Sequence, residues 1–320
     1  FAHSTTEGES VIYADDDTDV VTDLDPEALK AKLQREANRS VDWVTDNRMV
    51  CAGDKTKLLI VGTSKARKQK LKNKRITVTV CGNVIGESHS EKLLGLIVNN
   101  NLTWKEHLYG EKWRDEENAP GLIPQLSQRV GLLSHIAHRV TASGFNSVSN
   151  GIFNSKLNYC LQVFGNTWGY DTHDTDKRRF SAFTKNDCQR LQVLQNKVLR
   201  LKTGLGKETP TKTLLEKSND MSVHQIITYH TLLSVYKILQ SKKPKYLFDR
   251  LDKSKLNNRG SRNSSNLNVQ GELTVTRGGF LYRGSKLFNM LPTNIKSLPT
   301  YKLFKKKVKL WIKHNISIKP

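Results

Sequence analysis

The sharpest change between apolar and polar positions lies near the start of the chain. Val11 to Tyr13 favour a strand, Asp15 to Asp17 are three consecutive carboxylates, and Val20 and Val21 restore the apolar pattern. This order predicts a strand, a tight turn that carries the carboxylates, and a returning strand. A solvated surface turn is one interpretation, because Asp hydrogen-bonds nearby backbone groups in turns. A divalent-cation site is the other, because adjacent ionised carboxylates repel each other unless a cation offsets their charge.

The following residues predict a helix and several strands. Asp25 followed by Pro26 is a helix start, and apolar positions then recur at helical spacing to about Asn47, which predicts packing on a sheet. Short apolar runs predict strands at 57–62, 76–81, 84–85 and 93–98, with a hairpin turn at Gly82 and Asn83. This order predicts an α+β fold with a mostly antiparallel sheet.

Beyond about Leu122 the apolar spacing becomes helical. One stripe runs over 126–140, and a second runs over 191–201 after Asp187, the predicted helix cap. A third helix begins at Ser222, whose capping box is completed by Gln225. Residues 253–268, rich in Asn, Ser, Lys and Arg, predict a linker.

Charge divides the chain unevenly. The sequence is 37% apolar and 26% charged, which is typical of a globular protein, and its formal net charge is +22. Residues 1–54 carry 13 acidic and 5 basic residues, a net charge of about −8, whereas the remainder carries about +30. An excess of this size predicts a nucleic acid or another anionic surface as partner.

Other classes of protein and site are disfavoured. The four Cys residues stand singly, which argues against a disulfide framework or a zinc knuckle and favours a reducing, intracellular location. No apolar run is long enough to span a membrane, so no membrane partner is expected. A calcium-binding loop at Asp15 fails, since Val20 stands where Gly is needed and Pro26 where Glu is needed.

Three motifs resemble one protein family. Tyr13-Ala14-Asp15-Asp16 resembles the YADD hairpin of reverse transcriptases, and Asp54-Lys55-Thr56 resembles the palm motif that follows it in non-LTR retrotransposon enzymes. The segment from Leu94-Gly95 through Asn101-Leu102-Thr103-Trp104 to His107 resembles their "LG…LTW…H" segment. The chain's end, 287–311, is similar to the tail of CR1 and jockey-type proteins, with Phe288 in place of their Trp.

The resemblance implies RNA-directed DNA synthesis by a two-metal mechanism. Asp15 and Asp16 would be the catalytic metal ligands for Mg²⁺, or Mn²⁺, and Lys55 would act beside the incoming nucleotide; the alternative for Lys55 is a surface Lys in a turn. The implied partners are an RNA template, a DNA primer and deoxynucleoside triphosphates. The implied location is the cytoplasm and nucleus, as a ribonucleoprotein.

The same resemblance predicts a carboxy-terminal fragment of such an enzyme. Residues 1–104 would be the later half of the palm with its catalytic hairpin, 105–205 a helical thumb-like region, and 206–320 a basic region that contains the linker. The family's earlier palm Asp and its fingers have no counterpart before Asp15, so we expect these 320 residues to be inactive alone.

Basic side chains on the predicted helices are candidates for contact with phosphates. They are Lys197, Arg200, Lys202, Lys305, Lys306 and Lys307. Near the last three, Phe304 and Trp311 suit either base stacking or the core. The rival interpretation of the whole chain is a degenerate remnant that acts only as a basic nucleic-acid-binding module.

Overall fold

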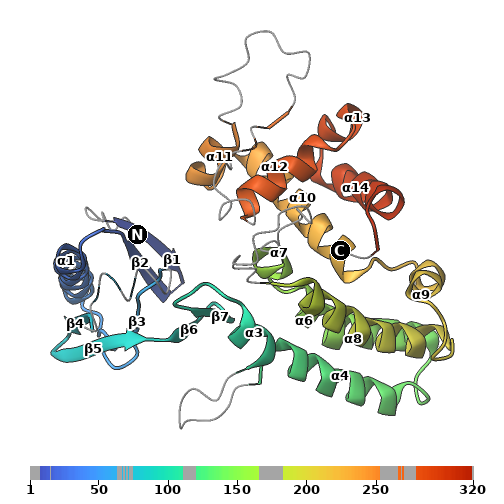
Figure 1. Cartoon of the computed structure of the whole chain (residues 1–320), viewed down its shortest axis with the longest axis horizontal. Coiled ribbons are helices and arrows are strands. Elements are labelled where there is room, and N and C mark those ends of the chain that lie inside the picture. The colour runs from blue at the N-terminus through green and yellow to red at the C-terminus, as the bar shows by residue number, and fades with distance from the viewer. Residues whose placement is uncertain are drawn as a thin grey trace. The chain divides into compact units, whose positions relative to one another are not determined.

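The chain forms two compact units, Phe1–Thr103 and Trp104–Pro320. The computed structural model describes residues 8–14, 16–62, 67, 69, 71, 75–110, 120–165, 183–252, 266–267, 269 and 279–318. In the first unit short strands accompany the long helix α1, and the described part of the second is mainly helical (Figure 1). The predicted α+β class is therefore confirmed, while the palm and thumb assignment stays a prediction.

The acidic segment forms the predicted hairpin. Strands β1 (Gly8–Tyr13) and β2 (Asp16–Val21) pair antiparallel, with Tyr13 opposite Asp16. Ala14 has a φ of 57°, the positive value that suits a tight turn between twisted strands. Position 15 lies outside the described residues.

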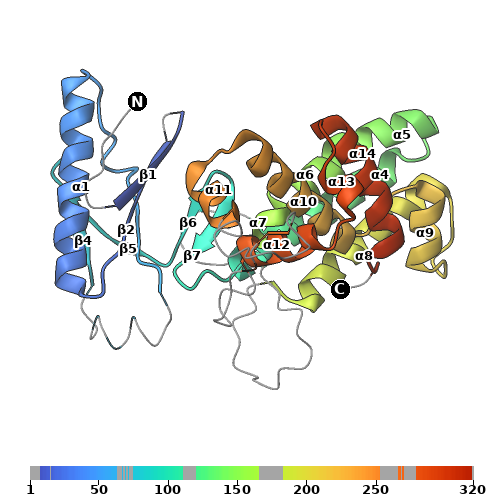
Figure 2. The same cartoon turned by 90° about the horizontal axis from the view of Figure 1, so that it is seen from above.

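Helix α1 (Pro26–Asp46) begins as predicted, with the Asp25 carboxylate accepting the Ala28 N–H. The helix contacts β2 and β4 (Thr77–Val80) of its own unit (Figure 2). The Gln34 side chain donates to the Thr79 carbonyl and accepts the Thr79 N–H, both at 2.8 Å. Because β4 is an edge strand, Gln34 satisfies backbone groups that have no strand partner.

The three-stranded sheet has the order β3-β5-β4. Strand β5 (Asn83–Ser88) pairs parallel with β3 (Leu58–Leu59) and antiparallel with β4. The strand predicted over 57–62 is thus shortened to two residues. The hairpin turn consists of Cys81 and Gly82, one position earlier than predicted, with φ values of 48° and 78°.

The single strand predicted over 93–98 is wrong. The segment is a second hairpin of β6 (Ser90–Leu93) and β7 (Leu96–Asn99), with Leu94 and Gly95 at its turn. Both turn residues have positive φ values, 45° and 83°, which a continuous strand cannot contain. The apolar composition of this segment favours a strand and gives no turn signal, since Leu is uncommon at turn positions with a positive φ value.

The second unit contains these elements within its described residues: α3 (Lys105–Tyr109), α4 (Leu122–Ile136), α5 (Ala142–Ser149), the π-helical turn η1 (Asn150–Asn154), α6 (Ser155–Asn158), α7 (Leu161–Phe164), α8 (Lys185–Thr203), α9 (Thr211–Ser218), α10 (Val223–Ser241), α11 (Lys245–Asp252), α12 (Phe280–Asn289), α13 (Thr293–Lys296) and α14 (Tyr301–Asn315). Helices on both sides of position 205 are in contact: α8, which ends before it, packs against α9 and α10, which follow it. The predicted boundary at 205 is not tested by this packing and stays a prediction.

Helix α10 is the centre of this unit. It contacts α7, α8, α11, α12 and α14, and most of its side chains are buried. Its predicted capping box at Ser222 and Gln225 is present in both directions. Phe304 of α14 is fully buried and stacks on Tyr236 of α10, with ring centroids 3.9 Å apart. Phe304 is therefore a core residue.

Asp187 is not the cap of α8. The helix is capped by Thr184, and Asp187 occupies the third helical position of a capping box. The Asp187 side chain is fully buried and also accepts hydrogen bonds from Tyr109 and from Lys105, whose Nζ lies 3.0 Å away. Burial would raise the Asp187 pKa, but these bonds to Tyr109, Thr184 and Lys105 outweigh it and lower the pKa. Asp187 thus joins α3 to α8.

A buried amide network fixes α8 against α10. Gln192 donates to the side chains of Gln195 and Asn196 at 2.8 and 2.9 Å, and accepts the Val223 N–H at 2.9 Å. These buried polar groups satisfy one another, which favours a single arrangement of the helices.

Some expectations fall on positions that are not described. The predicted linker lies outside the described residues except at 266 and 267, and residues 111–119 are also outside them. Among the helices that are described, none is both long and apolar enough to cross a membrane.

Candidate functional site

At the hairpin tip Asp16 lies on one face of the strand pair, and Asp17 and Asp19 lie on the other. Side chains alternate along a strand, so Asp16 shares a face with Tyr13, whereas Asp17 and Asp19 lie on the opposite face. Asp16 is exposed and Tyr13 is 66% exposed. Asp17 accepts a hydrogen bond from Ser10 at 2.7 Å, and Asp19 accepts one from Ser40 of α1 at 3.1 Å. The face that carries Asp17 and Asp19 is therefore held by protein contacts.

Among the described residues the tip offers one exposed donor of the kind that a hard divalent cation prefers. Mg²⁺ is usually held by one or two carboxylates together with phosphate oxygens of a substrate, and Asp16 offers an exposed carboxylate at the tip. Asp15, the other predicted ligand, lies outside the described residues. Within the described part of the chain no three His, Cys, Asp or Glu side chains are grouped for metal binding. A metal at this tip would thus need oxygen ligands beyond Asp16.

Lys55 lies on an exposed turn of the same unit. Its N–H donates to the Ala52 carbonyl at 3.0 Å, while the neighbouring Lys57 ammonium reaches the Asp54 carbonyl at 3.3 Å. The side chain of Lys55 faces solvent. Among the described residues no hydrogen bond or ion pair joins Lys55 to Asp16, so the predicted role of Lys55 beside the nucleotide rests on the sequence.

Residues of the "LTW…H" segment have structural contacts. Asn99 accepts the Thr103 N–H at 2.7 Å and donates to the Thr103 hydroxyl at 2.6 Å, which closes the turn after β7. His107 is buried against Phe164, with ring centroids 5.0 Å apart. Burial, with a smaller contribution from Lys156, lowers the His107 pKa to about 4, so this ring is neutral at pH 7.

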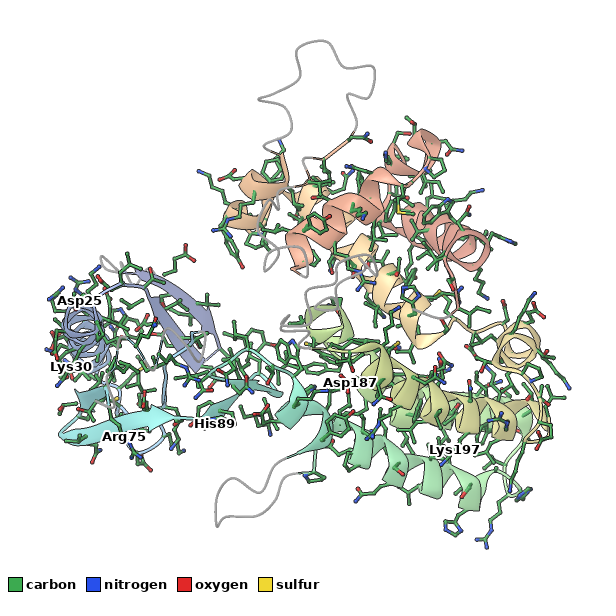
Figure 3. The ribbon with its side chains drawn as sticks, in the orientation of Figure 1. Asp25, Lys30, Arg75, His89, Asp187 and Lys197 are labelled. Atoms are coloured by element: carbon green, nitrogen blue, oxygen red, sulfur yellow. The ribbon has the colours of Figure 1, made fainter. Side chains whose placement is uncertain are left out.

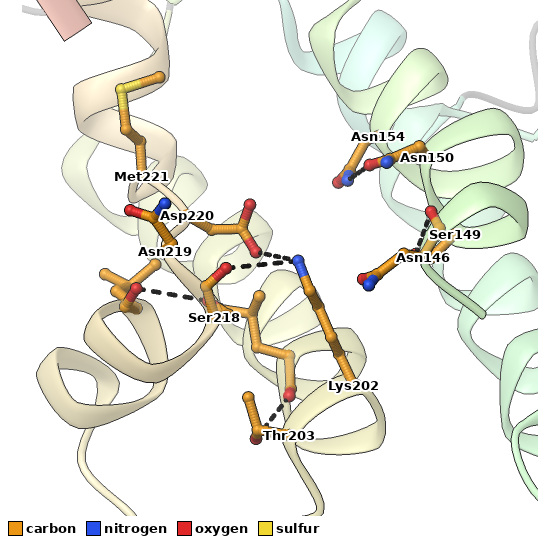
Figure 4. A network of polar contacts seen from close by, with 12 residues as sticks. Asn146, Ser149, Asn150, Asn154, Lys202, Thr203, Ser218, Asn219, Asp220 and Met221 are labelled. Atoms are coloured by element: carbon orange, nitrogen blue, oxygen red, sulfur yellow. Dashed lines mark hydrogen bonds and ion pairs between the residues drawn. The ribbon is translucent and has the colours of Figure 1, made fainter. Parts of the chain in front are cut away.

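The predicted phosphate-binding residues of α8 have different surroundings. Lys197 is exposed (Figure 3). Arg200 donates to three loop carbonyls, of which that of Lys207 lies 2.9 Å away. Lys202 pairs with Asp220 at 2.9 Å and also reaches the Ser218 carbonyl (Figure 4). Arg200 and Lys202 thus hold the loops around α9, and Lys197 is the better candidate for a phosphate.

The basic side chains of α14 are mostly presented to solvent. Lys305, Lys306 and Lys307 are all exposed. The helix is anchored through Phe304, Val308 and Ile312, which are fully buried. These buried residues hold α14 in place against the rest of the unit. The sequence alone does not show which of its lysines lie on the same side of the helix.

Comparison with known proteins adds no relative. No protein-family model, curated protein or solved structure matches this chain.

Proposed function

We propose that this chain belongs to an RNA-directed DNA polymerase of a non-LTR retrotransposon. The observation that carries the proposal is the Tyr-Ala-Asp-Asp motif at the tip of an antiparallel hairpin, with Tyr13 opposite Asp16. Asp16 is exposed at the tip of a short hairpin, so its carboxylate is accessible to a substrate. Accessibility suits a residue that must hold a metal against a reacting phosphate.

The order of the later motifs supports the proposal. The hairpin is followed by α1, the turn with Lys55, a small sheet and the Leu94-Gly95 turn. Some motif residues have a structural role and take no part in the chemistry. Leu94 and Gly95 form a tight turn, and Asn99 is hydrogen-bonded to Thr103. Such residues fix the backbone, and the carboxylates remain the reactive groups.

Each candidate residue has a distinct part in the proposed reaction. Asp15 and Asp16 would hold Mg²⁺ or Mn²⁺, which lowers the barrier by stabilising charge on the attacking and leaving oxygens. Lys55 would offset charge on the triphosphate of the incoming deoxynucleotide. The substrates are an RNA template with a DNA primer, which implies a ribonucleoprotein found in the cytoplasm and nucleus.

A second candidate is nucleic-acid binding without catalysis. It is favoured by the charge of about +30 on residues 55–320, which does not depend on an intact metal site. In that case Lys197 and the lysines of α14 would bind phosphates, and Asp15 and Asp16 could be replaced without loss of the function.

Primer extension on an RNA template with Mg²⁺ tests the first candidate. The chain is compared with one lengthened upstream along its reading frame, each with Asp16→Asn, with Asp15→Asn, and with Asp17→Asn as matched control. We expect extension by the longer chain, its loss with either motif variant, and its retention with Asp17→Asn, which has the same charge change one residue away.

Two outcomes would contradict the proposal. If the longer chain binds primer–template but does not extend it, binding without catalysis is the better description. If Asp17→Asn is as damaging as Asp16→Asn, the acidic turn acts through its total charge and the motif has no special role.

A further inference from the structure

The last helix carries a stripe of lysines on one side. At about 3.6 residues per turn, Lys302, Lys306, Lys309 and Lys313 fall within one narrow arc of α14, away from its buried side. The first three are exposed, whereas Lys313 donates to the Asn219 carbonyl at 2.7 Å. Lys305 and Lys307 lie outside this arc.

Few negative charges oppose this stripe. No Asp or Glu follows Glu272 in the sequence, so α12, α13 and α14 have none. Asp220, which lowers the positive potential near Lys313, is itself paired with Lys202. From Lys302 to Lys313 the stripe presents about one ammonium per turn over about 16 Å.

A shallow pocket opens beside the first turn of α14. Its volume is about 280 Å³. It is lined by Tyr236, Lys237, Gln240, Ser241, Pro299 and Tyr301. Tyr301 is 38% exposed, and the Lys237 ammonium lies 5.7 Å from its ring centroid. The pocket therefore combines an aromatic ring, a cation, an amide and a hydroxyl within one small open space.

One residue of the pocket wall, Tyr236, is held by contacts with the core. The Tyr236 hydroxyl donates to the Leu298 carbonyl at 2.6 Å, and its ring is stacked on the buried Phe304. Tyr301 directly precedes Lys302 but projects about 100° away from it round the helix, so the pocket lies beside the first turn of the lysine stripe, on the side of α14 that faces α10. An aromatic platform next to a row of cations is the combination by which proteins bind single-stranded nucleic acids.

We propose that α14 and the end of α10 form a binding site for single-stranded nucleic acid. Phosphates contact Lys302, Lys306 and Lys309, and one unpaired base enters the pocket to stack on Tyr301, with its polar edge toward Gln240 and Ser241. The proposal uses only residues of the second unit and does not require the hairpin to be catalytic.

The pocket distinguishes this partner from a membrane surface. The side of α14 that carries Phe304, Val308 and Ile312 is buried in the protein, and the exposed Leu303 and Leu310 stand about two turns apart on one flank of the helix. A helix that binds lipid inserts its apolar side into the bilayer. In α14 that side is not available, whereas the lysines and the aromatic pocket are.

Fluorescence anisotropy with a labelled 12-nucleotide oligomer tests the proposal on the full chain. Replacing Lys302, Lys306 and Lys309 by Gln is expected to weaken binding about 10- to 100-fold at low salt and to reduce the slope of log affinity against log salt by about 2. The matched control replaces the exposed Lys207, Lys212 and Lys217 by Gln, with the same charge change in the same unit. The three Lys→Arg changes in the stripe should retain binding, and circular dichroism checks the fold.

A second set of variants tests the pocket. Tyr301→Ala is expected to weaken single-strand binding about 10-fold, with Tyr301→Phe near wild type, because stacking needs the ring and not the hydroxyl. Tyr246→Ala, at another exposed tyrosine, is the control. Binding of a duplex of the same sequence should be unaffected by Tyr301→Ala, since its bases are already paired and stacked.

Three results would overturn the proposal. Equal losses from the two lysine triples would mean that only total charge matters. Equal losses of single strand and duplex with Tyr301→Ala would mean that no base enters the pocket. Tight binding to phosphatidylserine vesicles through the same lysines, with no measurable oligomer binding, would assign the surface to a membrane. Failure of primer extension would not affect any of these results.

Discussion

The two units differ in how completely they bury their apolar residues. In the first unit the described buried apolar side chains all keep between 4 and 9% of their surface exposed: Ile60, Ile76, Val78, Val80 and Leu96. In the second unit many are fully buried, among them Leu126, Phe153 and Phe304. The hairpin itself exposes Val11, Tyr13 and Val20 by half or more. The proposed catalytic motif thus lies in the unit with the thinner core.

The residues that stabilise the fold are therefore largely separate from the acidic residues that the hairpin exposes to solvent. Burial of apolar surface is the main source of stability, so the helical unit should unfold at a higher denaturant concentration than the hairpin unit. The acidic tip, by contrast, needs exposure and gains little from packing. Substitutions in the two units should therefore differ in size, and the following predictions run from the largest effect to the smallest.

Phe304→Ala should have the largest effect. Removing a fully buried ring that stacks on Tyr236 leaves a cavity, and such changes cost about 3–5 kcal/mol of unfolding free energy. Urea unfolding followed by circular dichroism should show the unfolding free energy of the helical unit reduced by this amount. Tyr13→Ala, which removes a 66% exposed ring from the hairpin, should change stability by less than about 0.5 kcal/mol. Similar effects from both would remove the contrast between the units.

Asp187→Asn should weaken the helical unit by about 2 kcal/mol at neutral pH. The variant loses the ion pair to Lys105 and some of the bonds from Thr184 and Tyr109 to the buried carboxylate. Because the native Asp187 pKa is lowered, its contribution is present above the pKa of the unfolded chain and is lost as the pH falls through the native value, below about 4.

A pH series of urea titrations checks this sign. Wild type and Asp187→Asn should differ most at pH 7 and should approach each other in stability as the pH falls through the lowered native pKa of Asp187. Asp249→Asn, at an exposed position of α11, is the control and should show little difference at any pH. A constant gap between wild type and Asp187→Asn would mean that the charge of Asp187 does not matter.

Local signals in the sequence predicted the element starts that depend on neighbouring residues. Asp25 and Ser222 were recognisable as caps because a cap bonds a backbone group within the next few residues. The turn at Leu94 gives no such local signal, since its apolar side chain resembles a strand residue. The predicted helix cap at Asp187 is three residues too late. Thr184 caps the helix, and the Asp187 side chain accepts a hydrogen bond from the Thr184 backbone within the first turn.

Contacts between distant segments could not be predicted. Arg200 and Lys202 look like free cations in the sequence, but folding brings loop carbonyls and Asp220 to them. Lys237 and Tyr301 stand 64 positions apart in the numbering, so no local pattern indicates that they share a pocket. The acidic hairpin was predictable because its whole motif lies within one short segment.

Gln34→Ala should weaken the first unit by about 1 kcal/mol. The variant leaves the Thr79 N–H and carbonyl of edge strand β4 without their two bonds to the helix. Amide hydrogen exchange in β4 and β5 should accelerate about fivefold, while exchange in α10 should not change. Lys30→Ala, at an exposed position of the same helix, is the control (Figure 3). No acceleration in β4 would mean that the edge does not depend on Gln34.

Asp16→Asn should have the smallest effect and the opposite sign. Removing one of several adjacent negative charges relieves repulsion, so the hairpin should gain about 0.2–0.5 kcal/mol at low salt and nothing at about 1 M salt, where charges are screened within about 3 Å. Asp17→Asn is the informative control, because it also weakens the 2.7 Å bond from Ser10 and should not stabilise the strand pair. Exchange rates of the β1 and β2 amides measure both.

A gain in hairpin stability on replacing Asp16 by Asn would show the contrast between the two units most clearly. Large effects at Phe304 and Asp187 would show side chains whose role is to fold the chain, whereas a residue whose removal stabilises its own hairpin is not explained by folding. Acidic repulsion at an exposed tip is then the cost of a site that attracts a cation, as expected where function and stability make opposite demands. If Asp16→Asn instead destabilised the hairpin, its carboxylate would have a structural role, and its place in the motif would no longer imply chemistry.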